Sequence, residues 1–366
     1  MKKPLISLII PTRERCDTLL FSLQTALNQE SRNYEIVISD NFSQDDTKKV
    51  VESFNDSRIK YFNSGKRLSM CDNWDFACEK AEGEFIIIIG DDDGVVPGGI
   101  DYLETLIQEH PADVYFWDKH IFTWPNKGKK AEINYIAGTE KPSSIDLKQQ
   151  ARESILWGAN DITDFPMIYH SAVSRKILGN ILESTGRIFH SVNPDIFSAF
   201  SLPVFSNNSM NVGRCITAHG RSPKSNSGGG KEARELFLKE FGNYQWHPSL
   251  NSDWPTQIFL VVDSPLRAME MFPEFYGDMN FNFSAMWAVY QKKSGKSIME
   301  ILRSREKIRQ YHPFHVSIFI YYLFAHYVST VKRKFLSKKS RIARRKISQG
   351  VLPNNILEFV NLVAEI

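Results

Sequence analysis

The stretch Phe85-Ile86-Ile87-Ile88-Ile89-Gly90-Asp91-Asp92-Asp93-Gly94 decides the fold. Four consecutive isoleucines predict a strand that is buried on both faces of a sheet, and three carboxylates follow at its carboxyl end. Ligands of open α/β sheets bind outside this end of the strands. Adjacent carboxylates repel one another unless a cation compensates, and their hard oxygen atoms select Mg²⁺ or Mn²⁺ rather than zinc or copper. The alternative interpretation is an acidic turn that caps a helix beginning near Pro97.

Strand and helix patterns alternate over the first 118 residues. Apolar runs predict strands at 5–10, 34–39, 58–62, 84–89 and 113–117, and helical spacing predicts helices at 17–28, 45–54, 70–81 and 97–109. This alternation is typical of a mostly parallel sheet covered by helices on both faces, so we expect an α/β fold. Beyond it we expect an insertion or hairpin at 118–150 and a helix at 194–202.

Polar residues also follow the first two predicted strands. Asp40, in Ser39-Asp40-Asn41, can accept hydrogen bonds from a base or a ribose, although an aspartate in this position also commonly closes a turn. Pro11-Thr12-Arg13-Glu14-Arg15 brings polar and cationic groups beside the other two strand ends, and solvated positions are equally compatible with both arginines.

Together these segments resemble the family 2 glycosyltransferases, which have the GT-A fold. The resemblance extends over residues 5–118 and continues more weakly to about residue 225. It rests on the order and spacing of five short motifs, namely Pro11-Thr12-Arg13-Glu14, Ser39-Asp40-Asn41, Asn73 with Ala81-Glu82-Gly83-Glu84, Asp91-Asp92-Asp93, and Pro97-Gly98. One position departs from the pattern, because the usual first aspartate of the family falls on Gly90 when the Pro-Gly pairs are aligned.

The resemblance implies a nucleotide-diphosphate sugar as donor. The residues it implies or makes candidates for donor binding are Pro11, Thr12, Arg13, Glu14, Asp40, Asn73, Asp91, Arg221 and Lys224. The resemblance also implies that Asp92 and Asp93 bind a divalent metal, Mn²⁺ or Mg²⁺. Asp91 would then either contact the ribose or lie near the metal without binding it directly. In some related enzymes a histidine at the position of His219 completes the metal shell, although a lone histidine is more often structural.

The resemblance also implies a catalytic base at the start of a later helix. Asp195 fits this role, because Pro194 suits the first turn of a helix and Asp195 would face the positive end of the helix dipole. An ordinary aspartate at a helix start is the alternative interpretation. Asp161 and Asp164 are rival candidates for the base.

The C-terminal part differs in character from the rest of the chain. Residues 315–331 are apolar and aromatic, and the nine lysines and arginines between 332 and 346 follow with no acid. With these nine set aside, the net charge of +3 becomes −6, which argues against nucleic-acid binding by the body of the protein. We expect a helix in the interface of an anionic membrane; a buried helix with a solvated basic tail, or a true membrane span, are the alternatives.

These observations predict three regions: a GT-A domain at 1–225, a helical region at 226–312, and a membrane-associating tail at 313–366. The loop at 222–231 serves either as a linker or as a lid. Four scattered cysteines and the lack of a signal-peptide pattern favour the cytoplasm, on the inner face of the cytoplasmic membrane. The sequence leaves the oligomeric state open.

The predicted function is an inverting transfer of a sugar to a hydroxyl of a glycan or lipid-linked acceptor, in bacterial polysaccharide (O-antigen or capsule) synthesis. The alternatives are a metal-dependent nucleotidyltransferase, although no glycine-rich phosphate loop is present, and a non-catalytic membrane-docked scaffold of the same fold. A Rossmann dehydrogenase is disfavoured, because no GxGxxG motif follows the first strand.

Overall fold

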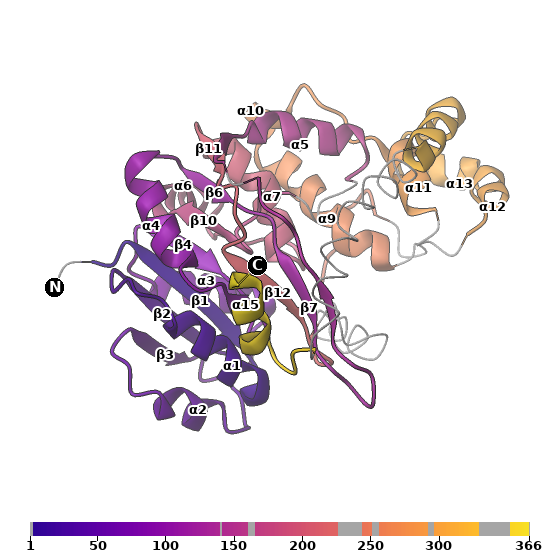
Figure 1. Ribbon diagram of the computed structural model, residues 1–366. Coiled ribbons are helices and arrows are strands. Elements are labelled where there is room, and N and C mark those ends of the chain that lie inside the picture. Colours follow the sequence, from indigo (N-terminus) through magenta and orange to yellow (C-terminus); the bar gives the residue numbers. More distant parts are fainter. Residues whose placement is uncertain are drawn as a thin grey trace.

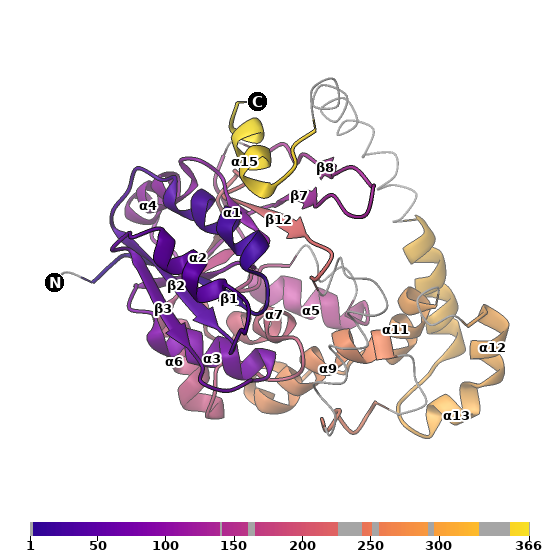
Figure 2. The same cartoon turned by 90° about the horizontal axis from the view of Figure 1, so that it is seen from below.

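The computed structural model describes residues 3–139, 141–159, 165–225, 244–250, 256–291, 296–328 and 352–365. A central sheet lies between two layers of helices, and a helical region lies beside it (Figures 1 and 2).

The central sheet has eight strands in the order β3-β2-β1-β4-β10-β6-β11-β9. Their bounds are β1 Ile6–Thr12, β2 Tyr34–Asp40, β3 Ile59–Asn63, β4 Phe85–Ile88, β6 Val114–Phe116, β9 Ser143–Ser144, β10 Ser171–Ser174 and β11 Ser209–Asn211. The first four strands are parallel to one another, whereas β10 is antiparallel to both of its neighbours, β4 and β6. The predicted mostly parallel sheet is therefore confirmed.

Helices cover both faces of this sheet, as the apolar strands require. The helices are α1 Cys16–Leu27, α2 Thr47–Ser53, α3 Met70–Lys80, α4 Gly99–Glu109, α6 Arg175–Thr185 and α7 Pro194–Phe205. Ile87 and Ile89 pack with α1, α2 and α4, while Ile86 and Ile88 pack with α3, α6 and α7. The run of isoleucines is thus explained by one strand that supplies two cores.

A second sheet has the order β5-β12-β7-β8, with β5 Gly94–Val95, β7 His120–Thr123, β8 Glu132–Asn134 and β12 Thr217–Arg221. The antiparallel pair β7–β8 is the hairpin expected within 118–150. Helix α15, Ile356–Ala364, packs on this sheet and on α1 through Ile356, Phe359, Val360 and Val363. The end of the chain therefore returns to the N-terminal domain (Figure 2).

The remaining helices form a separate core with α7. They are α5 Leu147–Leu156, α9 Thr256–Met271, α10 Pro273–Tyr276, α11 Phe283–Tyr290, α12 Ile298–Arg303, α13 Arg305–Arg309, and a further helix at 316–328. Phe197 and Phe200 of α7 pack among Phe, Trp and Met side chains of α9 and α11. In the part of the chain that the structure describes, no helix has the length and hydropathy that crossing a bilayer requires.

Candidate active site

The acidic cluster lies where β1, β2 and β4 end. The register pairs Thr12 with Asp40, and Asp91 to Asp93 follow β4 on the other side of β1. All three aspartates are at most 3% exposed. They do not cap the next helix, because α4 begins after Gly98, which makes no side-chain cap. The turn-capping interpretation is therefore wrong, and the surroundings of the carboxylates define their role.

Asp91 is neutralised from the loop that follows β1. Its Oδ2 accepts a hydrogen bond from Thr12 Oγ1 at 2.7 Å, and its Oδ1 accepts one from Arg15 Nη1 at 2.8 Å. A second guanidinium nitrogen of Arg15 donates to the carbonyl of Lys224 at 2.8 Å. Arg15 therefore links the acidic cluster to the segment after β12.

Asp93 has the most donors of the three carboxylates. Its Oδ2 accepts hydrogen bonds from the Gly90 amide (2.6 Å) and from Tyr169 Oη (2.5 Å), and its Oδ1 accepts one from the Gly220 amide (2.6 Å). His170 Nε2 and His219 Nδ1 lie 3.1 and 3.3 Å from the carboxylate. Burial opposes ionisation, but the two histidines outweigh it and hold the pKa of Asp93 well below its usual range.

A buried hydrogen-bond chain fixes the tautomer of His170. Trp117 Nε1, which can only donate, donates to Thr217 Oγ1 at 2.8 Å, and Thr217 Oγ1 lies 2.7 Å from His170 Nδ1. The Thr217 hydroxyl is fully buried and its proton has His170 as its acceptor, so Nδ1 accepts and Nε2 carries the proton that points to Asp93. Burial lowers the pKa of His170 to about 4, which agrees with a neutral ring.

Asp92 has the least support for a negative charge of the three aspartates. Its Oδ2 accepts a hydrogen bond from the Ser222 amide at 2.8 Å, and its Oδ1 accepts none from the described residues. Burial, followed by the negative charges of Asp93 and Asp91, raises the pKa of Asp92 to about 7. A buried carboxylate of this kind favours a bound cation.

The residues present fit a divalent cation. Ligand atoms of Asp93, His170 and His219 lie within 4.8 Å of one another, and His170 Nε2 and His219 Nδ1 are both buried without a hydrogen-bond partner among the described residues. The carboxylate of Asp92 belongs to the same turn as Asp93. Carboxylate oxygens together with an imidazole nitrogen suit Mn²⁺ or Mg²⁺.

Asp40 and Asn73 lie at the neighbouring strand end. Asp40 Oδ2 accepts hydrogen bonds from Tyr61 Oη at 2.5 Å and Asn63 Nδ2 at 3.0 Å, and its Oδ1 accepts one from the Ser43 amide at 2.9 Å. Asn73 is buried on α3 and accepts a hydrogen bond from Ser39 Oγ. Asn73 thus links α3 to the end of β2 through a hydrogen bond.

The other predicted donor-binding residues line the loops around the cluster. Pro11 and Arg13 are half-buried, and Arg221 is exposed at the end of β12. Lys224 Nζ donates to the Glu14 carbonyl at 3.1 Å. Glu14 itself has a φ of 55°. The loops after β1 and β12 therefore touch each other beside the cluster.

Asp195 lies half-buried in the first turn of α7, as predicted. Burial raises the pKa of its carboxyl, opposed by the nearby Lys119 and His219. The rivals Asp161 and Asp164 lie outside the described residues.

Sequence reasoning missed His170 and Tyr169 and left Arg15 undecided. Neither His170 nor Tyr169 belongs to a motif, and both reach Asp93 only because β10 pairs with β4. The one local signal is the position of Arg15, which follows shortly after the end of β1 at Thr12.

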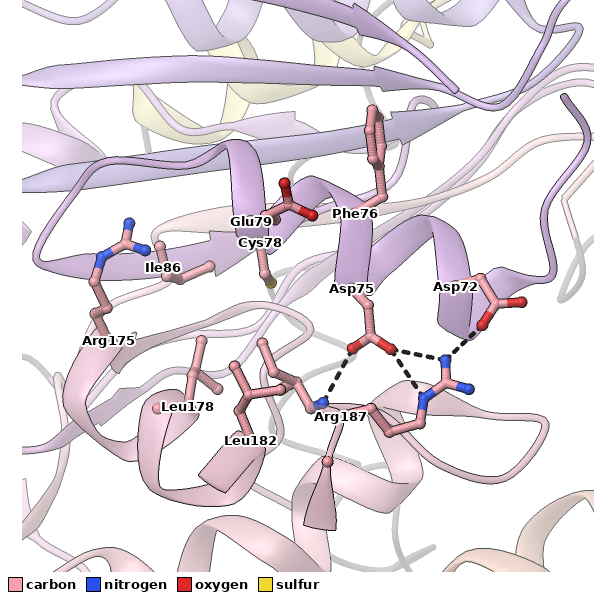
Figure 3. A pocket seen from close by; sticks show the side chains of 13 residues that line it. Asp72, Asp75, Phe76, Cys78, Glu79, Ile86, Arg175, Leu178, Leu182 and Arg187 are labelled. Atoms are coloured by element: carbon pink, nitrogen blue, oxygen red, sulfur yellow. Dashed lines mark hydrogen bonds and ion pairs between the residues drawn. The ribbon is translucent and has the colours of Figure 1, made fainter. Parts of the chain in front are cut away.

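A hollow of about 570 Å³ lies elsewhere, between α3 and α6 (Figure 3). Its two arginines are already engaged, Arg175 by backbone carbonyls of Ala81 and Gly83, and Arg187 by Asp72 and Asp75. No aspartate of the acidic cluster lines it. This hollow therefore adds nothing to the acidic site.

Residues 7–178 match the sequence model of Glycosyl transferase family 2. These residues form a family 2 glycosyltransferase domain. The resemblance inferred from the motifs is thereby confirmed.

The domain is similar to bacterial sugar transferases. It is 35% identical over 115 residues to the GalNAc(5)-diNAcBac-PP-undecaprenol beta-1,3-glucosyltransferase of Campylobacter jejuni, covering 31% of this chain and 37% of the relative. It is 28% identical over 137 residues to the UDP-Glc:alpha-D-GlcNAc-diphosphoundecaprenol beta-1,3-glucosyltransferase WfaP of Escherichia coli, covering 36% and 55%. The chain thus spans about a third to a half of the length of these relatives.

The crystal structure of S. aureus TarS 1-349 in complex with UDP-GlcNAc has a similar fold. The TM-score is 0.51 at 15% identity, over 85% of this chain and 93% of TarS 1-349. The family 2 domain therefore has the GT-A fold, as its motifs implied.

Proposed function

We propose that this protein is an inverting glycosyltransferase that moves a sugar from a nucleotide-diphosphate sugar to a hydroxyl of a lipid-linked glycan. The observation that carries the proposal is Asp92, the one carboxylate of the cluster with an oxygen that accepts no hydrogen bond from the described residues. Mn²⁺ or Mg²⁺ on Asp92, Asp93 and His219 would neutralise the diphosphate leaving group. The names of both bacterial relatives specify undecaprenol-linked substrates, which supports a lipid-linked acceptor in surface-polysaccharide synthesis.

The side chains divide the work. Positive charge for the donor phosphates comes from Lys224 and Arg221, which lie in the loop and strand end beside the acidic cluster. Arg15 adds to it when the donor replaces Asp91 as the partner of its guanidinium group. Asp40 and Asn63 offer polar groups for the nucleoside at the end of β2. Asp195 accepts the proton of the attacking hydroxyl, and its raised pKa suits a general base.

The test is donor-dependent stabilisation and sugar transfer. We expect UDP-sugars with Mn²⁺ to raise the melting temperature, since a ligand at about 100 times its Kd adds about 2.7 kcal/mol. Asp92→Ala should abolish this shift and the transfer, whereas Glu52→Gln, an exposed acid on α2, should alter neither. Transfer of the nucleotide instead of the sugar would favour a nucleotidyltransferase, and binding without any transfer would favour a scaffold.

The helix at 316–328 supports attachment to a membrane surface. Phe319 is fully buried in the helical core, while Ile320, Tyr321, Phe324 and Tyr327 are 53–69% exposed. The nine cations of 332–346 follow in the sequence and lie outside the described residues. We propose that this apolar face lies in the interface of an anionic membrane, where each basic residue adds about 1 kcal/mol.

Vesicle flotation tests the attachment. Truncation after residue 331 is unsuitable, because it would also remove α15 from the core of the N-terminal domain. We therefore substitute all nine basic residues by Gln in place, and separately Phe324→Ser. Both variants should float less with phosphatidylglycerol vesicles than the unmodified protein does. Equal flotation of all three would contradict the proposal.

A further inference from the structure

Asp263 on α9 is a fully buried carboxylate that lies outside the acidic cluster. Its Oδ2 accepts hydrogen bonds from Ser191 Oγ (2.8 Å), Tyr244 Oη (2.6 Å) and Arg267 Nε (2.8 Å). Its Oδ1 accepts one from the His247 amide at 2.8 Å. Four donors from three segments converge on one carboxylate, which is the arrangement a buried charge requires.

One of these segments leads directly into α7. Ser191 has a φ of 70°, in the left-handed region that a serine adopts only at a cost of about 1–2 kcal/mol. Two further contacts hold the same loop on α9, because Ser264 Oγ donates to Ser191 Oγ at 2.9 Å and Asn193 Nδ2 donates to the Leu260 carbonyl. Helix α7 begins at Pro194, directly after Asn193.

The carboxylate of Asp195 depends on this loop for its position. Its Oδ1 accepts a hydrogen bond from the adjacent Ile196 amide, and no side chain among the described residues contacts it by a hydrogen bond. The backbone of residues 191–194 therefore sets where the carboxylate lies.

We propose that Asp263 is a positioning residue for Asp195, acting through Ser191. This inference rests on the proposed function, in which Asp195 is the base. By holding Ser191 in its unusual conformation, Asp263 fixes the first turn of α7 and hence the distance from Asp195 to the acceptor hydroxyl. It lies within the expected helical region of the chain, 68 residues after Asp195, and no motif marks it.

Two substitutions act on this network. Ser191→Ala removes the hydrogen bond between the loop before α7 and Asp263, and Asp263→Asn weakens the hydrogen bonds that this carboxylate accepts. Asp278→Asn is the matched control, because the Asp278 side chain is 66% exposed and, within the part of the chain that the structure describes, pairs with Arg152 alone.

Steady-state kinetics decides the proposal. Ser191→Ala and Asp263→Asn should lower kcat about ten- to a hundredfold while KM for the donor changes less than about twofold. Asp278→Asn should leave kcat within about threefold of the unmodified enzyme. In an Asp195→Asn background, Ser191→Ala should lower the residual rate no further, because the side chain it positions is already disabled.

Other outcomes are equally informative. An unchanged kcat in Ser191→Ala, or a loss that is additive with Asp195→Asn, overturns the positioning role. If Asp263→Asn fails to fold, Ser191→Ala still decides, since it removes one hydroxyl. Full activity of Asp195→Asn would instead refute the proposed base, and absence of transfer by the unmodified protein would refute the proposed function.

Discussion

At the scale of single residues, three adjacent aspartates have three different environments. Asp91 is paired with Arg15, Asp93 is saturated by amides, a phenol and two histidines, and Asp92 is left with one amide. The sequence could predict that this triplet binds a cation. It could not rank the three, because the partners that separate them come from the segment after β1, from the residues just before β10, and from β12 and the residue after it, all more than 70 residues away.

This difference predicts opposite effects of two similar substitutions. In a chelator, Asp92→Asn should stabilise the protein by about 1–3 kcal/mol, because burial and the charges of Asp93 and Asp91 disfavour an ionised carboxylate at this position. Asp93→Asn should destabilise it by about 3 kcal/mol or more, because donors that the carboxylate satisfied lose their acceptor. Denaturant unfolding in EDTA measures both. A loss of stability in both variants would contradict our ranking.

At the scale of elements, the acidic turn and β12 approach each other closely. A Cβ on Gly220 would lie 1.8 Å from the Asp92 carbonyl oxygen, a backbone atom that cannot turn aside. The same strand supplies His219 and the Gly220 amide to Asp93. The second sheet is therefore what brings these groups to the end of β4.

We expect Gly220→Ala to separate β12 from the acidic turn, lowering stability and abolishing donor-dependent stabilisation. Gly179→Ala is the matched control, because a Cβ there meets nothing within 4 Å on α6. Replacing a glycine inside a helix should stabilise the protein by about 0.5–1 kcal/mol. Melting temperatures with and without donor and Mn²⁺ distinguish the two. Normal donor binding by Gly220→Ala would show that the close approach is dispensable.

Sequence patterns predicted most elements of the first domain but not the second sheet. Strands β1, β2 and β4 carry apolar runs buried from both faces, and helices α1, α3 and α4 carry apolar stripes, so local pattern suffices. Strands β5, β7 and β12 have two to five residues, and their pairing joins segments about 100 residues apart. Helix α5 was missed because its stretch is polar except for one narrow face.

At the scale of the whole molecule, buried histidines make stability depend on pH. His120 accepts a hydrogen bond from the Ile136 amide, and His312 accepts one from Trp287 Nε1, so each ring uses a nitrogen lone pair that protonation would remove. Burial lowers the pKa of both histidines to about 4, from an ordinary value of 6.5. Between pH 6.5 and 4, these two histidines therefore bind protons more readily in the unfolded chain than in the folded protein.

This difference in proton binding determines how the free energy of unfolding changes with pH. As pH falls from 6.5 to 4, the unfolded state gains protons first, so the free energy of unfolding decreases by at most about 1.4 kcal/mol per pH unit for each histidine. His120→Gln and His312→Gln should each flatten this dependence, while the exposed His315→Gln should not. Urea unfolding at pH 4.5, 5.5 and 6.5 measures it. An unchanged slope in both variants would assign the acid sensitivity to other groups.

Helix α15 has a consequence for the order of events during synthesis. Phe359 stacks on Phe122 of β7, and Ile356 and Val360 cover Gly94 of β5, so residues translated long after α1 complete the layer to which α1 belongs. Until α15 has left the ribosome, this apolar surface of the second sheet is exposed to water. The N-terminal domain can therefore close only after the helical region has been synthesised, and a chaperone could bind the exposed strip until then.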